Sequence, residues 1–264
     1  MITVTKSSLP ELEKYIGYLK RIWSLSRAQR MNRDQILKGL MEGKIELIKF
    51  CLGNNKSIFS FADLGGVWGV DGGYTFYILS KYNITKAYLF DTNISQIVLS
   101  KSKNYPQLEL HELNFGSDEA VSKISNVDMI LLFDVLLHQV NPDWNEVLAK
   151  YAPKTNYFLI YNPQFDAEKT VRLLDLGKKE YFTHVPHKPT GIYSLLFTDR
   201  EGEVRNMHNI WQWGITDNDL RNVMEKLNFS EIHFFRDKRW GKSKFTSKGF
   251  IFKKMNKTLK VAKV

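Results

Sequence analysis

The sequence predicts an α/β fold: a doubly wound, mostly parallel sheet of seven strands whose last pair is antiparallel. Three observations lead to this prediction. Short apolar runs alternate with helical stretches between residues 57 and 161, a pattern typical of parallel strands joined by crossover helices. A glycine-rich turn follows the first apolar run. The alternation resumes after residue 215 with one helix and two closing strands.

The first fifty residues have helical spacing throughout. A capping-box pattern at Ser8 begins one helix, and a second helix is expected from Asn32 or Arg33 to about Leu52. We expect these helices to form an N-terminal cap over residues 1–55.

The sheet domain is predicted to span residues 56–254. Its strands are expected at Ser57–Asp63, Ala87–Asp91, Leu108–Glu112, Val127–Phe133, Tyr157–Tyr161, Phe229–Phe235 and Gly249–Lys253. Its helices are expected at Tyr74–Tyr82, Ile94–Ser102, Asp118–Ile124, Trp144–Tyr151 and Asp217–Leu227, the last capped by Thr216. Residues 164–215 interrupt this rhythm after the fifth strand. They are too rich in aromatic residues for disorder, and insertions of this length are usually functional.

Composition excludes several classes of protein. With 43% hydrophobic and 25% charged residues the chain is globular rather than disordered. The single cysteine, Cys51, excludes an internal disulfide and a cysteine-based zinc cluster. The N-terminus lacks the apolar region of a signal peptide, and no run reaches the ~18 apolar residues of a membrane helix, so we expect a cytoplasmic protein.

The net charge of +10 is concentrated at the C-terminus. Five lysines and no acidic residue lie in residues 253–264, and they supply half of the excess. We interpret residues 255–264 as a basic tail, which either holds phosphate groups electrostatically or simply keeps a frayed terminus soluble.

The glycine-rich turn is the most informative segment. Asp63 ends an apolar strand, and five glycines follow within residues 65–73, Gly65, Gly66 and Gly69 among them. Glycine allows unusual backbone conformations and the close approach of a ligand. Such a turn at the carboxyl edge of a parallel sheet is a usual ligand site. The dinucleotide pattern G-x-G-x-x-G and the P-loop pattern are both absent, so neither of these phosphate sites is predicted.

The segment Asp63-Leu64-Gly65-Gly66-Val67-Trp68-Gly69 resembles the first motif, D-x-G-x-G-x-G, of class I S-adenosylmethionine-dependent methyltransferases, which have a Rossmann-like fold. The resemblance implies S-adenosylmethionine as the cofactor. Gly65 and Gly69 would pass beside its methionyl and ribose portions, and Asp63 would anchor the turn or meet its ammonium through water. Val67 departs from the family's glycine, which also leaves open a non-catalytic, methyltransferase-like partner subunit.

Later strand ends extend the resemblance, which spans about Ser57 to Lys253. The family places an acid at the end of the second strand, where its carboxylate takes both ribose hydroxyls. It places an amide and an apolar residue near the adenine after the third strand, and cofactor-facing residues after the fourth. The cofactor-binding residues implied here are Asp63, Gly65, Gly66, Gly69, Asp91, Asn114, Phe115, Asp134 and Val135. Asp91 also has an interpretation as a turn cap, and Asn114 as an ordinary Asx turn.

Three histidines are candidate catalytic residues. Transfer to a hydroxyl needs a base that removes the proton, and histidine titrates near neutral pH. His138 follows the fourth strand, and His184 and His187 lie in the insertion. A structural role in packing remains the alternative for each. The pair His184 and His187 has no third ligand at suitable spacing, so we expect no metal.

Candidate substrate contacts lie at the two ends of the insertion. Residues 161–164, Tyr-Asn-Pro-Gln, resemble the N-P-P-[YF] motif of adenine and amide N-methyltransferases, but they follow the fifth strand and lack the second proline. Asn162 and Gln164 are nevertheless candidate hydrogen-bond donors to a substrate. His208, Trp211 and Trp213 would suit a sugar or a planar ring, or would pack beneath the cap.

The sequence therefore predicts a methyltransferase whose insertion, residues 164–215, forms the acceptor pocket. We expect transfer to oxygen on a small polar acceptor, such as a sugar or a glycan-related molecule. An RNA or protein methyltransferase is an alternative, which the basic tail favours and the lack of a recognisable RNA-binding appendage disfavours. The sequence gives no indication of an oligomeric state.

Overall fold

The computed structural model describes residues 40–208, 210–240 and 243–255. The expected helix at Ser8, the expected start of the second helix at Asn32 or Arg33, and all but the first residue of the basic tail lie outside the described residues. The predicted domain boundaries after residues 55 and 254 stay predictions.

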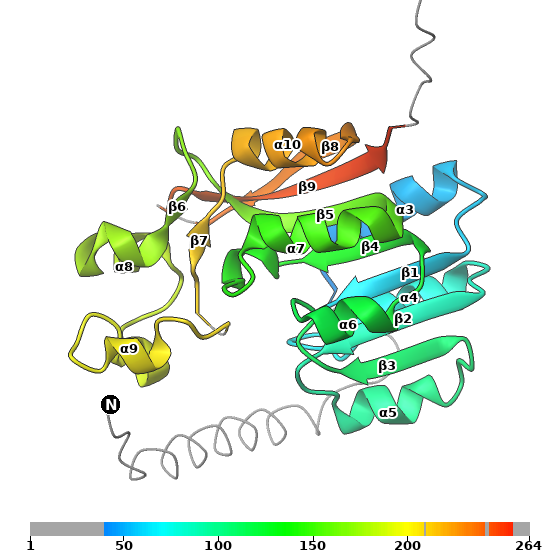
Figure 1. Cartoon of the computed structure of the whole chain (residues 1–264), viewed down its shortest axis with the longest axis horizontal. Helices are drawn as coiled ribbons and strands as arrows, with labels where there is room; N and C mark the ends of the chain where they lie inside the picture. Colours follow the sequence, from blue (N-terminus) through cyan, green and yellow to red (C-terminus); the bar gives the residue numbers. More distant parts are fainter. Residues whose placement is uncertain (1–39, 209, 241–242, 256–264) are drawn as a thin grey trace, which may run out of the picture. The chain divides into compact units, whose positions relative to one another are not determined.

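The sheet has seven strands in the order β3-β2-β1-β4-β5-β9-β8 (Figure 1). Strands β1 to β5 are parallel, and β9 runs antiparallel to both β5 and β8. The strands are β1 (Ser60–Leu64), β2 (Lys86–Asp91), β3 (Leu108–Glu112), β4 (Val127–Phe133), β5 (Thr155–Phe165), β8 (Phe229–Arg239) and β9 (Phe245–Lys254). The predicted mixed sheet is thereby confirmed.

The strand order fixes where a ligand can bind. The chain builds β1, β2 and β3 toward one edge and then returns to place β4 on the other side of β1. The carboxyl ends of β1 and β4 therefore flank the point at which the connections reverse direction. In open parallel sheets this point is where ligands bind.

Helices lie on both faces of the sheet. They are α3 (Glu42–Asn54), α4 (Gly73–Lys81), α5 (Gln96–Ser102), α6 (Asp118–Lys123), α7 (Trp144–Tyr151) and α10 (Asp217–Lys226), with short 3-10 helices η1 (Leu136–His138) and η2 (Ala152–Lys154). Side chains at the N-caps of α5, α6 and α10 accept a hydrogen bond from a free amide of the first turn: Ser95, Ser117 and Thr216. Helix α7 begins with a capping box of Asp143 and Glu146. The predicted cap at Thr216 is confirmed. Helix α3 packs against β5 and β9.

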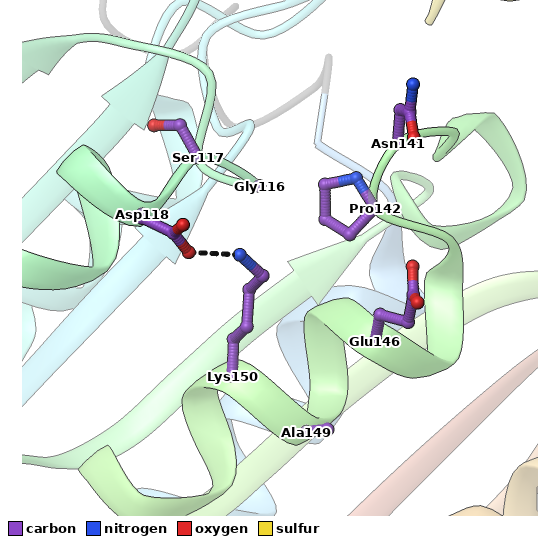
Figure 2. Close-up of a pocket in the computed structure, with 8 residues that line it drawn as sticks. All are labelled: Gly116, Ser117, Asp118, Asn141, Pro142, Glu146, Ala149 and Lys150. Atoms are coloured by element: carbon purple, nitrogen blue, oxygen red, sulfur yellow. Dashed lines mark hydrogen bonds and ion pairs between the residues drawn. The ribbon is translucent and has the colours of Figure 1, made fainter.

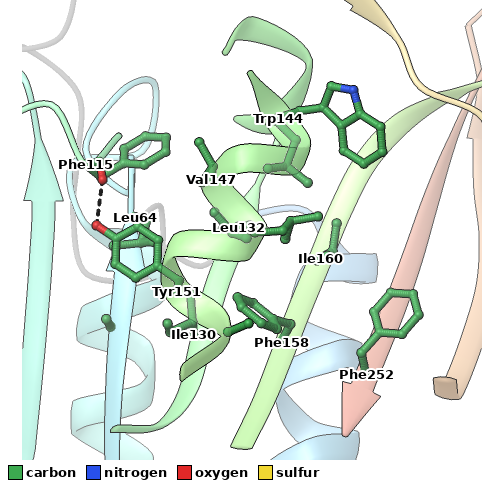
Figure 3. Packing of buried hydrophobic residues seen from close by; sticks show 14 of the residues in the cluster. Leu64, Phe115, Ile130, Leu132, Trp144, Val147, Tyr151, Phe158, Ile160 and Phe252 are labelled. Carbon is green, nitrogen blue, oxygen red and sulfur yellow. Dashed lines mark hydrogen bonds between the residues drawn. The ribbon is translucent and has the colours of Figure 1, made fainter. Parts of the chain in front are cut away.

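The main hydrophobic core lies between the sheet and helices α6, α7 and α10. Figure 3 shows the part of it that packs against α7. Leu132 and Phe158 from the central strands are completely buried in it, together with Tyr151 of α7. The Tyr151 hydroxyl donates a hydrogen bond of 2.6 Å to the Phe115 carbonyl, so the buried phenol is satisfied. This bond also holds the end of the β3 segment against α7.

The insertion forms a second, smaller core beside the carboxyl ends of β4 and β5. Its elements are β6 (Val171–Arg172), η3 (Leu173–Leu176), α8 (Lys178–His184), η4 (Gly191–Ser194), α9 (Glu201–Val204) and β7 (Trp213–Gly214). Leu173, Tyr181 and Trp211 are among its buried residues. Lys248 of β9, 2% exposed, pairs with Asp166 near the start of the insertion at 2.8 Å and with Asp217, the first residue of α10 after the insertion, at 2.9 Å.

Strand β5 continues four residues beyond its predicted end. Residues 162–165 lack the apolar character of a buried strand, but they pair with β9, where Gln164 lies opposite Thr246. They form a strand because β9 supplies hydrogen-bond partners for their backbone, and their own side chains do not predict this pairing. In the described part of the chain, no helix has both the length and the apolar character needed to cross a bilayer.

Candidate active site

The glycine-rich turn lies where β1 ends and α4 begins. Gly65 and Gly69 both have φ of +78°, a left-handed conformation that a side chain would strain. The Gly65 amide donates to the Phe90 carbonyl at 2.7 Å, which ties the start of the turn to β2. Among the residues that the structure describes, a Cβ at Gly69 would meet no atom within 4 Å, so a side chain there would have space.

Asp63 anchors the turn from below. Its side chain is buried and accepts a hydrogen bond of 2.6 Å from the Thr75 hydroxyl of α4. A Cβ at Gly66 would lie 2.3 Å from Asp63 Oδ2, so only glycine fits above this carboxylate. Burial raises the pKa of Asp63 to about 6, against the lowering effect of the Thr75 hydrogen bond. These contacts match the anchoring alternative for Asp63.

Asp91 faces the glycine turn from the end of β2. Its Oδ2 accepts hydrogen bonds from the Val67 amide at 2.9 Å and the Trp68 amide at 3.2 Å. Its Oδ1 accepts a longer bond, 3.4 Å, from the Asn93 amide. Burial raises the pKa of Asp91, although the backbone amides of the turn oppose this shift. The carboxylate is thus fixed at the rim of the sheet beside the turn.

The departure from the family motif at Val67 has a structural explanation. Val67 is not among the residues with positive φ, so a branched side chain is tolerated there. It is 1% exposed and packs inward, while its amide donates to Asp91. The turn keeps its connection to Asp91 without a third glycine.

Two further predicted cofactor residues, Phe115 and Val135, meet at Gly65. A Cβ at Gly65 would lie 2.7 Å from Val135 Cγ1 and 3.2 Å from Phe115 Cε1, so the turn is in close contact with the ends of β4 and β3. Asn114 Oδ1 accepts from the Gly116 amide at 2.9 Å, which is the predicted Asx turn. Its Nδ2 lies 3.3 Å from Nε2 of His208, so the insertion reaches the rim at this point.

Asp134 lies at the carboxyl end of β4 in a left-handed conformation, with φ of +57°. This conformation is uncommon for a residue with a side chain and indicates a local constraint. Its carboxylate forms an ion pair of 2.5 Å with Lys44 of α3. The Lys44 side chain is 7% exposed and that of Asp134 is 34% exposed, so the lysine is buried and the carboxylate is partly accessible to solvent.

Lys44 is the main residue that the sequence analysis did not single out. Lys44, Leu47, Ile48 and Cys51 are all buried on one face of α3. The sequence does contain a signal for this residue, because Lys44 falls at helical spacing on an apolar face. A lysine is rarely fully buried unless it is paired, so this position indicates a buried lysine with a partner.

A cavity of about 550 Å³ adjoins Asp134. Its walls come from the start of α3, from α8 and the segment after it, and from β8 and β9. The lining residues are Met41, Asp134, Thr183, His184, Val185, Pro186, Lys238, Arg239, Trp240, Ser243 and Ser247. The insertion thus contributes to a cavity at the carboxyl end of β4, and His184 is the predicted catalytic residue that lines it.

A second cavity, of about 570 Å³, lies between the starts of α6 and α7 (Figure 2). An ion pair between Asp118 and Lys150 crosses it, and Pro142 and Glu146 line its other side. None of the predicted site residues lines this cavity, so we do not assign it to the site.

The three candidate catalytic histidines have different surroundings. His138 Nδ1 lies 2.7 Å from the Ile210 carbonyl of the insertion. Burial lowers the pKa of His138, with His187 and His208 contributing in the same direction, and Asp134 and the Ile210 carbonyl opposing it. His187 is exposed and stacks on Tyr193, with ring centroids 4.5 Å apart.

His184 is 6% exposed, and its Nδ1 has no hydrogen-bond partner among the described residues. Burial lowers its pKa. In the part of the chain that the structure describes, no three His, Cys, Asp or Glu residues are grouped so that they could hold a metal ion.

The candidate substrate residues are largely buried. Asn162 and Gln164 are completely buried, and Asn162 Oδ1 and both polar atoms of Gln164 lack a hydrogen-bond partner among the described residues. Trp211 is 4% exposed and packs edge-on against Trp240 in the second core. Trp213 donates from Nε1 to the Gln139 carbonyl at 2.7 Å. Contact of these residues with a substrate stays a prediction.

The residues present fit the cofactor that the first motif implies. The open backbone at Gly69 leaves room beside the turn, and the Asp91 carboxylate lies at the same rim. Phe115 and Val135 provide an apolar surface on the other side of Gly65. A nucleoside offers hydroxyls that a carboxylate can bind and an apolar ring that an apolar surface can contact, so these residues suit the nucleoside part of the cofactor.

No protein-family model matches the sequence, and no curated protein matches it significantly. Solved structures share the fold. The 1,6-didemethyltoxoflavin-N1-methyltransferase of Burkholderia thailandensis, bound to S-adenosylhomocysteine, aligns over 97% of this chain and 93% of its own, with a TM-score of 0.58 and 11% identity. The magnesium protoporphyrin IX methyltransferase of Synechocystis PCC 6803, with the same ligand, aligns over 90% of this chain and 95% of its own, with a TM-score of 0.55 and 12% identity.

The N-methyltransferase NodS of Bradyrhizobium japonicum WM9, also in complex with S-adenosylhomocysteine, aligns over 81% of this chain and 86% of its own, with a TM-score of 0.50 and 8% identity. The structural alignments establish a common architecture, whereas sequence identities this low do not indicate which acceptor is methylated. The order of the strands and the antiparallel β9 agree with this architecture. The chain therefore has the fold of the class I S-adenosylmethionine-dependent methyltransferases.

Proposed function

We propose that the protein is an S-adenosylmethionine-dependent methyltransferase that methylates oxygen on a small polar acceptor, such as a sugar or a glycan-related molecule. The observation that carries this proposal is the Asp91 carboxylate, held by the Val67 and Trp68 amides at the rim of the sheet. The solved structures of the same fold contain S-adenosylhomocysteine, which supports the same donor here.

S-Adenosylmethionine supplies the methyl group as an electrophilic sulfonium. The chain's own part is to bind the donor at the glycine turn, to align the acceptor and to exclude water. Asp91 Oδ1, which has only weak contacts with nearby amides, is suited to accept from a ribose hydroxyl. The 550 Å³ cavity beside Asp134 is large enough for a small acceptor.

His138 is the strongest candidate for the base. If its Nδ1 proton is donated to the Ile210 carbonyl, its Nε2 carries the free lone pair. Its lowered pKa keeps the ring neutral at pH 7, so Nε2 can accept a proton from a hydroxyl. His184, in the cavity wall, and His187, close enough to affect the pKa of His138, remain further candidates.

Calorimetric titration with S-adenosylhomocysteine tests the donor. We expect wild-type protein to bind it and Asp91→Ala to lose about 1–3 kcal/mol of binding free energy, because a hydrogen bond to a charged group is removed. Asp118→Ala is the matched control, since the Asp118 carboxylate is 94% exposed and lies in the other cavity. Absence of binding by the wild-type protein would overturn the proposal.

Release of S-adenosylhomocysteine in the presence of candidate sugars tests the reaction. With an active acceptor, His138→Ala should lower kcat by about 10²–10⁴ while leaving donor affinity intact. Full turnover by a folded His138→Ala protein would exclude this residue as the base.

A further inference from the structure

Lys44 is a buried cation that contacts one carboxylate and three aromatic rings. Its Nζ lies 5.3 Å from the ring centroid of Tyr74, 5.8 Å from that of Phe133 and 5.3 Å from that of Tyr161. Its one hydrogen bond within the described residues goes to Asp134. Since an ammonium has three donors, Lys44 has capacity for a further acceptor.

The charge state of Lys44 follows from its surroundings. Burial by itself lowers the pKa of Lys44, but attraction to Asp134, with smaller contributions from Tyr74 and Asp63, raises it above its ordinary value. The ammonium is therefore protonated at neutral pH. Buried ion pairs contribute little net stability because both charges lose their hydration, so stability alone is a weak reason for this one.

The pair lies on the opposite side of the glycine turn from Asp91. Asp134 follows β4, Asp91 ends β2, and β1 lies between these strands. Both Lys44 and Asp91 act electrostatically on Asp63, which lies near the end of β1 beneath the turn. A ligand that spans the turn would therefore meet a lone carboxylate at one end and an ammonium–carboxylate pair at the other.

The proposed methyl donor has matching ends. Its ribose offers hydroxyl donors, which suit a carboxylate, and its amino acid end carries one carboxylate and one ammonium. With the ribose at Asp91, as in the proposed function on which this inference rests, an amino acid end that crosses β1 toward β4 would meet Lys44 and Asp134. Lys44 and Asp134 present the complementary charges there, and the Asp134 side chain is accessible.

We propose that Lys44 and Asp134 together bind the amino acid end of the methyl donor, with the Lys44 ammonium facing its carboxylate and the Asp134 carboxylate facing its ammonium. Helix α3 thereby becomes part of the donor site, although it precedes the glycine turn in the chain. The Met41 amide, which donates to the Tyr74 hydroxyl at 3.0 Å, holds the start of α3 against α4 in this arrangement.

Two ligands separate this role from general effects. S-Adenosylhomocysteine carries the amino acid end, whereas methylthioadenosine retains the nucleoside and lacks that end. In calorimetry, wild-type protein should bind S-adenosylhomocysteine more tightly. Lys44→Met should weaken S-adenosylhomocysteine binding by about tenfold to a hundredfold, since a hydrogen bond between charged groups is lost, and should leave methylthioadenosine binding unchanged.

Two further variants guard against misfolding and against a nonspecific charge effect. The double variant Lys44→Met with Asp134→Asn leaves no unpaired buried charge, and it should lose the preference for S-adenosylhomocysteine in the same way. Lys49→Met removes an exposed lysine from the same helix and should bind both ligands as the wild type does.

The possible outcomes are distinct. If the Lys44 variants bind S-adenosylhomocysteine like the wild type, or weaken both ligands equally, the inference is wrong although the proposed function stands. If the wild type binds neither ligand, the proposed function fails first and the inference fails with it. Selective loss of S-adenosylhomocysteine binding supports the inference.

Discussion

The two sides of the candidate site are built from different material. The proposed donor side, residues 63–69 with Asp91, consists of glycine backbone, amides and two carboxylates at the ends of adjacent strands. The proposed acceptor side, the cavity beside Asp134, is lined by side chains from segments far apart in the sequence. A site made of backbone depends mainly on the sheet beneath it, whereas a site made of side chains depends on how separate segments pack.

Substitutions in the two hydrophobic cores should have the largest effects on stability, and they test whether the two sides unfold separately. Leu132 in the sheet core and Leu173 in the insertion core are both completely buried, so each change to alanine should lower the free energy of unfolding by about 2–5 kcal/mol. We expect Leu132→Ala to weaken protection of amides throughout the sheet. Leu173→Ala should act mainly on residues 164–215, because a small core can open locally.

Native-state hydrogen exchange distinguishes these results. In Leu173→Ala the amides of β1 and β2 should exchange as in the wild type, and S-adenosylhomocysteine affinity should persist. Equal loss of protection in both regions would mean that the two sides form one cooperative unit.

Asp63 gives the next largest effect, on the donor side alone. Its pKa is about 6 in the folded protein against an ordinary 3.8, so between these values the native state holds a proton that the unfolded chain has lost. The free energy of unfolding should therefore fall as pH rises through this window, by up to about 3 kcal/mol. Below pH 3.8 the stabilisation is complete, and above pH 6 it is lost.

Urea denaturation at pH 4 and pH 7 measures this change, and Asp63→Asn should lack it. Asp118→Asn is the control, since its carboxylate is almost fully exposed and its loss should leave the wild-type pH dependence. If Asp63→Asn shows the same pH dependence as the wild type, the Asp63 carboxyl is not the group responsible.

The smallest expected effect concerns the junction between the two sides. Trp213→Phe removes the hydrogen bond from the indole to the Gln139 carbonyl, which joins β7 to the segment after η1. A loss of about 1 kcal/mol in unfolding free energy is expected, with the ring packing retained. Thermal unfolding measures it, and an unchanged transition would show that this bond does not hold the insertion.

The strands and helices of the sheet were predictable because their patterns are local. Leu108–Glu112 and Val127–Phe133 are strands within their predicted bounds, and Trp144–Tyr151 is a helix within its own. Apolar alternation and helix caps are properties of neighbouring residues, so no tertiary information is needed. The ends of β5, β8 and β9 were missed, since these strands lengthen through pairing with one another.

The parts of the candidate site that consist of backbone were easier to predict from the sequence than the parts that consist of side chains. Gly65 and Gly69 have the positive φ angles that glycine alone adopts easily, and the sequence shows these glycines directly. The position of Asp91 beside the turn was expected because it ends a strand at the family's spacing; its contact with the ribose stays a prediction. Lys44 was missed, since its partner Asp134 is 90 residues away and nothing local indicates their meeting.

The sequence by itself determined the parallel sheet, the order of its elements along the chain and the glycine turn after β1. These features arise from periodicity and from the φ angles that single residues allow. Only the tertiary structure decided that Asp91 holds the amides of the turn, that Lys44 pairs with Asp134, and that the insertion walls a cavity beside them. Such contacts join residues far apart in the chain, and their geometry is set by strand order and packing, which no local pattern contains.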